Sequence, residues 1–138
     1  MKLTEILKAY SDPTRLRMMN LLANRGPEIC VCNIVAALEL PQSTVSRQLM
    51  MLRHLGVVND RRMGAWVHYS LERGDSGAQR AMLDLLKCCP AEDPQFAEDL
   101  AAFDRVMTAK AEAEACATSS KTCCEKPEVS LAAGVGES

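Results

Sequence analysis

The stretch that decides the fold is "LPQSTVSRQLMMLRHLGVVNDRRMGAWVHYSL", residues 40–71. In its first part, Gln42 to Leu55, apolar residues recur at helical spacing: Val45, Leu49, Leu52 and Leu55. This pattern predicts an amphipathic helix that ends at Gly56. From Val57 to Leu71 the sequence changes to near alternation with β-forming residues. This change predicts a hairpin with its turn near Arg62 to Gly64.

Three helices are expected ahead of this stretch. Leu3 to Tyr10 has a single apolar stripe at helical spacing. The second helix has Ser11 or Asp12 as its N-cap, a proline in its first turn and Gly26 as its stop. The letters "CVCNIVAALEL", residues 30–40, predict a third, short helix. The last two of these helices and the one at residues 42–55 are close enough in sequence to pack together.

Two further helices are expected after the hairpin. Residues Ala78 to Lys87 predict a helix that stops at Pro90, and Asp93 is expected to cap the next one. The last helix carries one apolar stripe: Phe96, Leu100, Phe103 and Met107. Such a stripe either packs on the chain's own core or completes a two-fold dimer, and we expect the dimer. Residues 1–116 are therefore expected to form the domain, and the polar, non-periodic residues 117–138 a disordered tail.

Composition restricts the class of protein. The chain has 138 residues, of which 48% are hydrophobic, so one globular domain with appendages is expected. An aromatic content of 4% argues against a surface that stacks single-stranded bases. No apolar run is long enough to span a membrane or serve as a signal peptide, so no membrane partner is expected and the protein is expected to be cytoplasmic. Residues 1–75 carry a net charge of +3 and residues 76–138 one of −5, so the first part could meet a polyanion.

A helix, a turn, a second helix and a two-stranded hairpin form a winged helix-turn-helix, a mainly α fold with a small β-hairpin. The apolar stripe leaves polar side chains facing outward in the first two turns of the second helix: Gln42, Ser43, Thr44, Ser46, Arg47 and Gln48. These residue types suit base edges and phosphates in the major groove of double-stranded DNA. Arg61 and Arg62 in the hairpin are expected to contact phosphates or the minor groove, and His68 is a further candidate for such a contact. Alternatively, the hydroxyls merely cap the helix and the arginines are solvated.

Seven cysteines in a chain without an export signal do not indicate a disulfide framework, so metal binding or redox chemistry is favoured. Cys30 and Cys32 lie about ten residues ahead of the helix predicted at residues 42–55, which we call the reading helix. Cys88 and Cys89 are adjacent to each other. The remaining three are Cys116, Cys123 and Cys124. Cys30 and Cys32 could also be small buried residues, which is the usual role of cysteine thiols in a core.

These motifs together resemble the ArsR/SmtB family of metal-responsive repressors. Residues 40–71 resemble the family's recognition helix and wing, and "SDPTRLRMMNLL", residues 11–22, its second helix. "ICVCNIV", residues 29–35, resembles the Cys-Val-Cys motif of arsenic-responsive members. The resemblance covers about residues 5–72. It implies a homodimer through the terminal helices that binds operator DNA and leaves it when As(III) or Sb(III) binds Cys30 and Cys32, without an organic cofactor.

The ligand set departs from the family pattern at one position. Arsenic-responsive members commonly have a third cysteine where this chain has Val35. A third ligand must then come from Cys88, Cys89 or the tail, or be supplied by a molecule other than the protein. Zinc-responsive relatives use histidines on the last helix, whereas the two histidines here are His54 and His68. No cysteine precedes Cys30, so the cadmium-type site is not expected.

Two thiols on a regular helix at i and i+2 project about 200° apart. We therefore expect that an ion bound to both Cys30 and Cys32 distorts the helix and thereby weakens DNA binding. A thiol-redox repressor of the same fold is the alternative. A thiol reductase that uses Cys88 and Cys89 is disfavoured because the sequence has no Cys-X-X-Cys motif and no nearby histidine.

Overall fold

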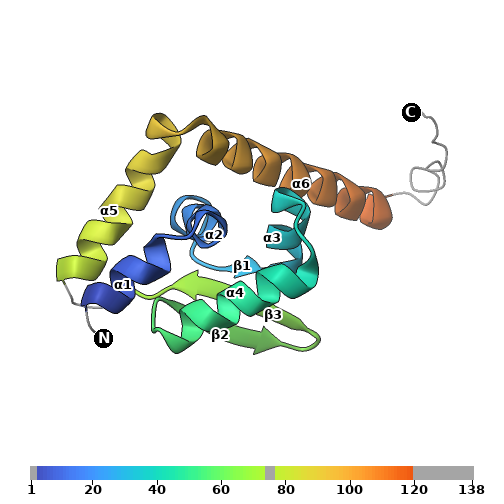
Figure 1. The fold of residues 1–138 in the computed structure, drawn as a ribbon. Coiled ribbons are helices and arrows are strands. Elements are labelled where there is room, and N and C mark those ends of the chain that lie inside the picture. Colours follow the sequence, from blue (N-terminus) through green and yellow to red (C-terminus); the bar gives the residue numbers. More distant parts are fainter. Residues whose placement is uncertain (1–2, 74–76, 120–138) are drawn as a thin grey trace. The chain divides into compact units, whose positions relative to one another are not determined.

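The computed structural model describes residues 3–73 and 77–119 (Figure 1). Its helices are α1 (Leu3–Tyr10), α2 (Pro13–Asn24), α3 (Val31–Leu38), α4 (Gln42–His54), α5 (Gly77–Glu92) and α6 (Pro94–Ser119). Its strands are β1 (Ile29–Cys30), β2 (Val58–Met63) and β3 (Trp66–Leu71). The chain divides into two units, residues 1–104 and residues 105–138, so α6 begins in the first unit and ends in the second.

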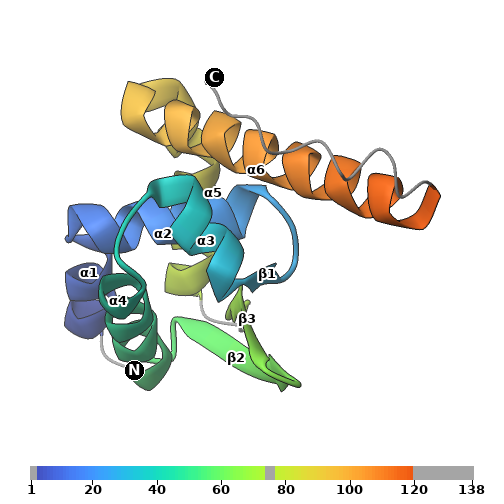
Figure 2. The same ribbon diagram turned by 90° about the vertical axis from the view of Figure 1, so that its right-hand side faces the viewer.

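The hairpin of β2 and β3 is the wing, and β1 pairs with β3 to complete a three-stranded antiparallel sheet, the wing sheet, in the order β1-β3-β2. The predicted hairpin is confirmed, and Figure 2 shows β2 and β3 extending away from the end of α4. Its turn follows Met63, one residue later than expected, and Gly64 takes the positive φ of 63° that the turn needs. β1 was not predicted, because a two-residue strand is too short to show a period. The winged helix-turn-helix fold predicted from the sequence is confirmed.

The core of the first unit forms around α2. Four hydrophobic side chains of this helix are essentially inaccessible to solvent: Met18, Met19, Leu21 and Leu22. The stripe predicted for α4 faces this core, since Val45, Leu49 and Leu52 are fully buried. The predicted N-cap of α2 is Asp12, whose Oδ2 accepts a hydrogen bond of 3.0 Å from the backbone N–H of Arg15. The core therefore fixes which face of α4 is turned outward.

Helix α5 continues through Pro90 to Glu92, so the prediction that it stops at Pro90 is wrong. Proline has no N–H to donate to the carbonyl four residues earlier, which here is that of Leu86. The side-chain amide of Asn24 donates a hydrogen bond of 3.1 Å to this carbonyl instead. The helix thus tolerates an interior proline because α2 supplies the missing donor.

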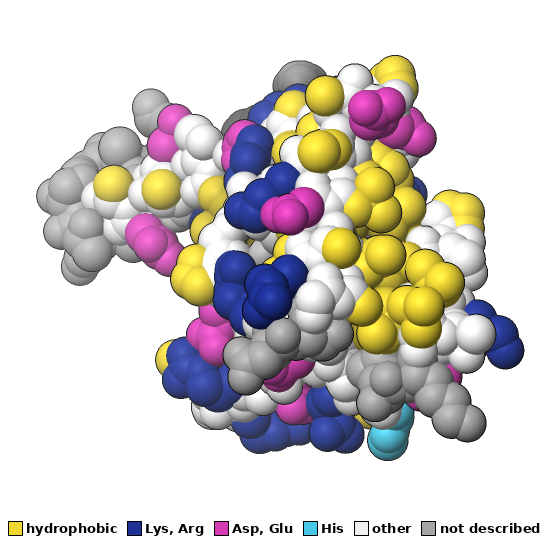
Figure 3. Space-filling view, turned by 90° about the vertical axis from the view of Figure 1, so that its left-hand side faces the viewer, with side chains coloured by type: hydrophobic (Ala, Val, Ile, Leu, Met, Phe, Trp, Pro, Cys, Tyr) yellow, Lys and Arg dark blue, Asp and Glu magenta, His cyan; other side chains and the backbone are white. Residues whose placement is uncertain are grey.

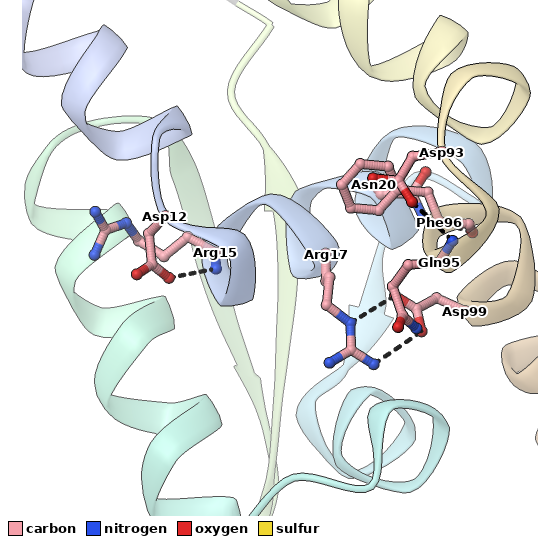
Figure 4. Close-up of polar contacts among 8 residues, drawn as sticks. All are labelled: Asp12, Arg15, Arg17, Asn20, Asp93, Gln95, Phe96 and Asp99. Atoms are coloured by element: carbon pink, nitrogen blue, oxygen red, sulfur yellow. Dashed lines mark hydrogen bonds and ion pairs between the residues drawn. The ribbon is translucent and has the colours of Figure 1, made fainter.

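Polar contacts tie α2 to the start of α6 (Figure 4). The guanidinium of Arg17 donates two hydrogen bonds, of 2.8 and 2.9 Å, to the carboxylate of Asp99, which is 2% exposed. The buried amide of Asn20 donates to the carbonyl of Phe96 at 3.2 Å. Asp93 caps α6 as predicted, because its Oδ1 accepts from the backbone N–H of Gln95 at 2.9 Å. The contacts of Arg17 and Asn20 join residues that are 82 and 76 positions apart in the sequence.

The apolar stripe of α6 packs on the chain's own core, contrary to the expectation that it completes a dimer. Phe96, Leu100 and Phe103 are buried in the first unit, and Met107 belongs to the second unit. The predicted boundary between a domain at 1–116 and a tail at 117–138 remains a prediction, since residues 120–138 lie outside the described part of the chain. No helix within residues 3–73 and 77–119 is both long enough and apolar enough to cross a membrane.

Candidate functional site

The thiols of Cys30 and Cys32 lie next to each other, with their Sγ atoms 2.9 Å apart. Cys30 is not part of the helix. It ends β1 with extended backbone angles (φ −68°, ψ 140°) and is the N-cap of α3. The expectation that the two sulfurs project to opposite sides of a regular helix is therefore wrong, because only Cys32 is helical. A change from extended to helical backbone between the two residues lets both side chains turn to the same side.

Local pairing explains why the backbone changes at this point. Ile29 and Cys30 pair with Tyr69 and His68 of β3, which holds this segment in the sheet. Helix α3 begins at the next residue, and its apolar side chains Ile34 and Leu38 are buried in the core. One thiol thus belongs to the wing sheet and the other to α3. Cys30 as a residue is 8% exposed, and Cys32 is half-buried.

A cavity of about 410 Å³ lies between α3, α4 and the wing. Cys32 lines it from α3, Gln42 and Ser46 from α4, and Arg62 and Trp66 from the hairpin. Gln42, Ser46 and Arg62 are three of the side chains predicted from the sequence to contact DNA. The thiol pair therefore has one member on the wall of a cavity that the reading helix and the wing also form.

The predicted DNA-contacting side chains of α4 do not all face outward. Gln42, Ser43 and Arg47 are exposed, and Thr44 and Ser46 are half-buried. Gln48 is turned back toward α2, where its Oε1 accepts a hydrogen bond of 3.1 Å from the guanidinium of Arg15. Arg15 also donates to the carbonyls of Ala9 and Lys8, so Gln48 is part of a structural contact among three helices.

The two wing arginines have different surroundings. Arg61 donates two hydrogen bonds, of 2.9 and 2.6 Å, to the carboxylate of Glu28, two residues before Cys30. These bonds hold the pKa of Glu28 below its usual range and raise that of Arg61. Arg62 lies on the cavity wall. Nearby, Arg53 of α4 forms a long ion pair of 3.7 Å with Asp60 of β2.

The structure does not bring Cys88 and Cys89 toward a common point. Cys88 is exposed, whereas Cys89 is buried in the core, and burial raises the pKa of the Cys89 thiol. A raised pKa disfavours the thiolate that a metal ion requires. Cys123 and Cys124 lie outside the described residues, as does the side chain of Cys116. Within the described residues, no three His, Cys, Asp or Glu side chains form a group that could hold a metal ion.

Two residues near the thiols, Glu28 and Trp66, were not singled out from the sequence, and a third, His68, was considered only for a contact with DNA. Glu28 engages a wing arginine, Trp66 lines the cavity, and His68 pairs with Cys30 across the sheet. The pairing of His68 depends on β1, which the sequence did not reveal. Glu28, the charged residue that follows Pro27, gave no signal of a contact with a strand more than thirty residues away.

The helices α3 and α4 and the hairpin β2–β3 define the winged helix-turn-helix class of proteins. The model of the family described as "Bacterial regulatory protein, arsR family" matches residues 12–60. The chain is 46% identical over 68 residues to an uncharacterized HTH-type transcriptional regulator, MJ1325, of Methanocaldococcus jannaschii, which covers 49% of this chain and 75% of that protein. The chain therefore belongs to the ArsR family, as the sequence motifs indicated.

Two further relatives are informative. The arsenic resistance transcriptional regulator ArsR1 of Pseudomonas putida is 48% identical over 66 residues, which cover 48% of this chain and 51% of that protein. The chain thus matches about half the length of this relative. The crystal structure of the AntR antimony-specific transcriptional repressor has 29% sequence identity and a TM-score of 0.55, covering 67% of this chain and 80% of that chain. These relatives are regulators, so a thiol-reductase activity is not supported.

Proposed function

We propose that this protein is a metalloid-responsive transcriptional repressor. It binds operator DNA through α4 and the wing, and it leaves the DNA when As(III) or Sb(III) binds the thiolates of Cys30 and Cys32. Thiolates are the ligands that soft, thiophilic ions prefer. The proposal is supported by relatives named for arsenic resistance and by an antimony-specific repressor of similar fold.

The separation of 2.9 Å between the two sulfurs carries this proposal. Cys30 belongs to the strand that pairs with the wing, and Cys32 belongs to the helix that packs against α4. An ion bonded to both sulfurs ties the wing sheet to α3. Helix α4 and the wing must fit the DNA at the same time. An ion that holds α3 and the wing sheet in a different arrangement therefore weakens DNA binding. The β1–α3 junction is thus the two-state element that links both sites.

The expected coupling between ion binding and DNA binding is large enough to be measured as a change in operator affinity. A coupling free energy of about 1 to 3 kcal/mol corresponds to about a 5- to 150-fold loss of operator affinity. Binding is measured by fluorescence anisotropy of labelled DNA from upstream of the protein's own gene, with and without arsenite. We expect Cys30→Ser and Cys32→Ser to bind this DNA normally and to stay bound when arsenite is added.

Cys88→Ser is the matched control, because Cys88 is exposed and distant in sequence from the junction. It is expected to release DNA like the wild-type protein. Release of the Cys30→Ser/Cys32→Ser double variant by arsenite would contradict the site. Loss of release in Cys88→Ser would move the site to α5.

We further propose that the repressor is a homodimer. Leu3 and Leu7 of α1 and Leu85 of α5 are large hydrophobic side chains that are 46 to 56% exposed. Figure 3 shows hydrophobic side chains gathered on the face that carries these helices. A second copy of the chain is a suitable occupant, because a two-fold dimer presents the same patch from both sides. Leu85→Glu should shift the mass measured by light scattering from dimer to monomer, whereas Met63→Glu in the wing should not.

The close approach of the two thiols also favours one alternative, a repressor that responds to oxidation. A bond between Cys30 and Cys32 would link the same strand and helix. Near-adjacent cysteines form strained bridges, which makes this response the less favoured one. The same anisotropy assay distinguishes them. Release by hydrogen peroxide that dithiothreitol reverses, without release by arsenite, would support the redox response.

A further inference from the structure

His68 lies directly beside the thiol pair in the sheet. Its backbone pairs with Cys30 of β1 on one side and with Arg61 of β2 on the other. Residues directly opposite each other on neighbouring strands point to the same face, with Cβ atoms about 4.5 to 5.5 Å apart. The imidazole of His68 and the thiol of Cys30 therefore share one face of the wing sheet.

The Nδ1 atom of His68 is shielded from solvent and has no hydrogen-bond partner among the described residues. A buried polar atom without a partner is unfavourable, and such atoms are rare in folded proteins. The neighbouring ion pair does not use it, since Arg61 donates to Glu28. Nδ1 is thus available to a group that binds at the thiols.

The chemistry of arsenous acid supplies such a group. As(OH)₃ reacts with two thiols to give a species with two As–S bonds and one remaining hydroxyl, and two molecules of water leave. Arsenic stays in the +3 state, and each water combines one hydroxyl with one thiol proton. Val35, three residues after Cys32, has no group that could displace the last hydroxyl.

On the basis of the proposed function, we propose that Nδ1 of His68 forms a hydrogen bond with this remaining hydroxyl. A hydroxyl both donates and accepts, so it can satisfy Nδ1 in either protonation state. His68 is then the residue by which the site recognises a metalloid that carries a hydroxyl. Because His68 is in β3, the contact also joins the ligand to the central strand of the wing sheet.

The proposal separates two kinds of ligand. A monosubstituted arsenical such as phenylarsine oxide, which is hydrated in water to PhAs(OH)₂, loses both hydroxyls as two molecules of water when it binds two thiols. It therefore leaves nothing for Nδ1 to contact. Replacing His68 should weaken arsenous acid and leave phenylarsine oxide unaffected, although both use Cys30 and Cys32.

Trp66 allows binding to be measured without DNA. It is the single tryptophan of the chain, it is 56% exposed, and it lines the cavity beside Cys32. Its fluorescence, together with the ultraviolet absorbance of the As–S bonds, gives the affinity of the purified full chain for each arsenical. We expect His68→Ala to weaken arsenous acid by about tenfold, the size of one hydrogen bond. The affinity for phenylarsine oxide should stay within twofold.

Two further variants test which nitrogen acts. The amide of asparagine stands two bonds from Cβ, as Nδ1 does, whereas that of glutamine stands three bonds away, as Nε2 does. His68→Asn should therefore keep most of the affinity for arsenous acid, and His68→Gln should lose it. His54→Ala is the matched control, since His54 is exposed at the end of α4, and it should bind both ligands normally.

Each result decides one question. Equal weakening of both arsenicals by His68→Ala would assign His68 a purely structural role and overturn the proposal, as would no weakening of either. Equal loss in the Asn and Gln variants would exclude Nδ1 as the contact, and this comparison remains valid if the alanine variant does not fold. Failure of wild-type protein to bind either arsenical would instead overturn the proposed function.

Discussion

The two sides of the first unit are held together by contacts of different kinds. Where α2 meets the start of α6, Arg17 pairs with the carboxylate of Asp99, whose side chain is 3% exposed. Where the wing meets β1 and α4, the ion pairs Glu28–Arg61 and Arg53–Asp60 have side chains that are 28 to 59% exposed. Exposed pairs contribute about 0 to 1 kcal/mol, whereas breaking a buried pair costs about 3 to 5 kcal/mol. The difference indicates that the side around α2 and α6, the body, is stable. The side around the wing and α4, the reading side, can be rearranged at a low cost in free energy.

The largest effect is expected at Asp99. Asp99→Ala leaves the guanidinium of Arg17 beside a buried gap and removes the acceptor of the Gln95 amide. We expect the free energy of unfolding to fall by about 3 kcal/mol in urea denaturation. Asp104→Ala is the matched control. Its partner is Arg25, the carboxylate is 53% exposed, and the loss should be below about 1 kcal/mol. Equal losses in the two variants would remove the difference between buried and exposed ion pairs on which the comparison of the two sides rests.

The second prediction contrasts the outer and inner faces of α4. Arg47 is exposed, whereas Gln48 is held by Arg15. Arg47→Ala should weaken binding to operator DNA by about 1 to 3 kcal/mol, the value of a good contact to a base. Gln48→Ala should change it by less than threefold, as measured by anisotropy. A comparable loss in both variants would mean that Gln48 leaves Arg15 when DNA binds.

The sequence predicted the body well and the site incompletely. The stripe Val45, Leu49 and Leu52 set the outward face of α4 because helical period and burial agree there. The prediction that α5 ends at Pro90 was wrong because the hydrogen bond that proline cannot make is replaced by one from Asn24, a residue of another helix. The convergence of Cys30 and Cys32 could not be seen, because it depends on a two-residue strand formed only by pairing with β3.

Motifs from residues close in sequence were thus readable, whereas contacts across the sheet were not. The resemblance to arsenic-responsive repressors identified Cys30 and Cys32 as the thiols to consider, and the structure brings these two together. The register of β1, β3 and β2 was needed to place His68 opposite Cys30 and to bring Glu28 close to Arg61. Their partners are thirty or more positions away, a separation at which no spacing rule applies.

The third prediction concerns the body at high pH. Burial raises the pKa of Tyr10 to about 12 from its usual 10.0. Above pH 10 the unfolded chain loses this proton and the folded chain keeps it, so the free energy of unfolding falls as pH rises from 10 to 12. Tyr10→Phe should lack this part of the decline, a difference of about 1 kcal/mol after solvent screening is allowed for. Urea denaturation of both proteins at pH 9 and pH 11.5 measures it, and parallel curves would contradict it.

The smallest effect is expected where the thiol segment meets the wing. Glu28 occupies the guanidinium of Arg61, so a phosphate must compete with a carboxylate for it. Glu28→Gln should free Arg61 and tighten DNA binding by about two- to threefold. One additional phosphate contact should also steepen the dependence of log K on log salt by about 0.9.

Glu92→Gln removes the same charge at the exposed end of α5 and serves as the control. If both variants tighten binding equally, the effect is one of net charge. If only Glu28→Gln does so and its salt dependence steepens, Arg61 has moved from the carboxylate to the DNA. That result would show that an ion pair on the reading side can be exchanged for a contact with DNA, unlike the buried pair at Asp99. The exchanged pair includes Glu28, which lies two residues before Cys30.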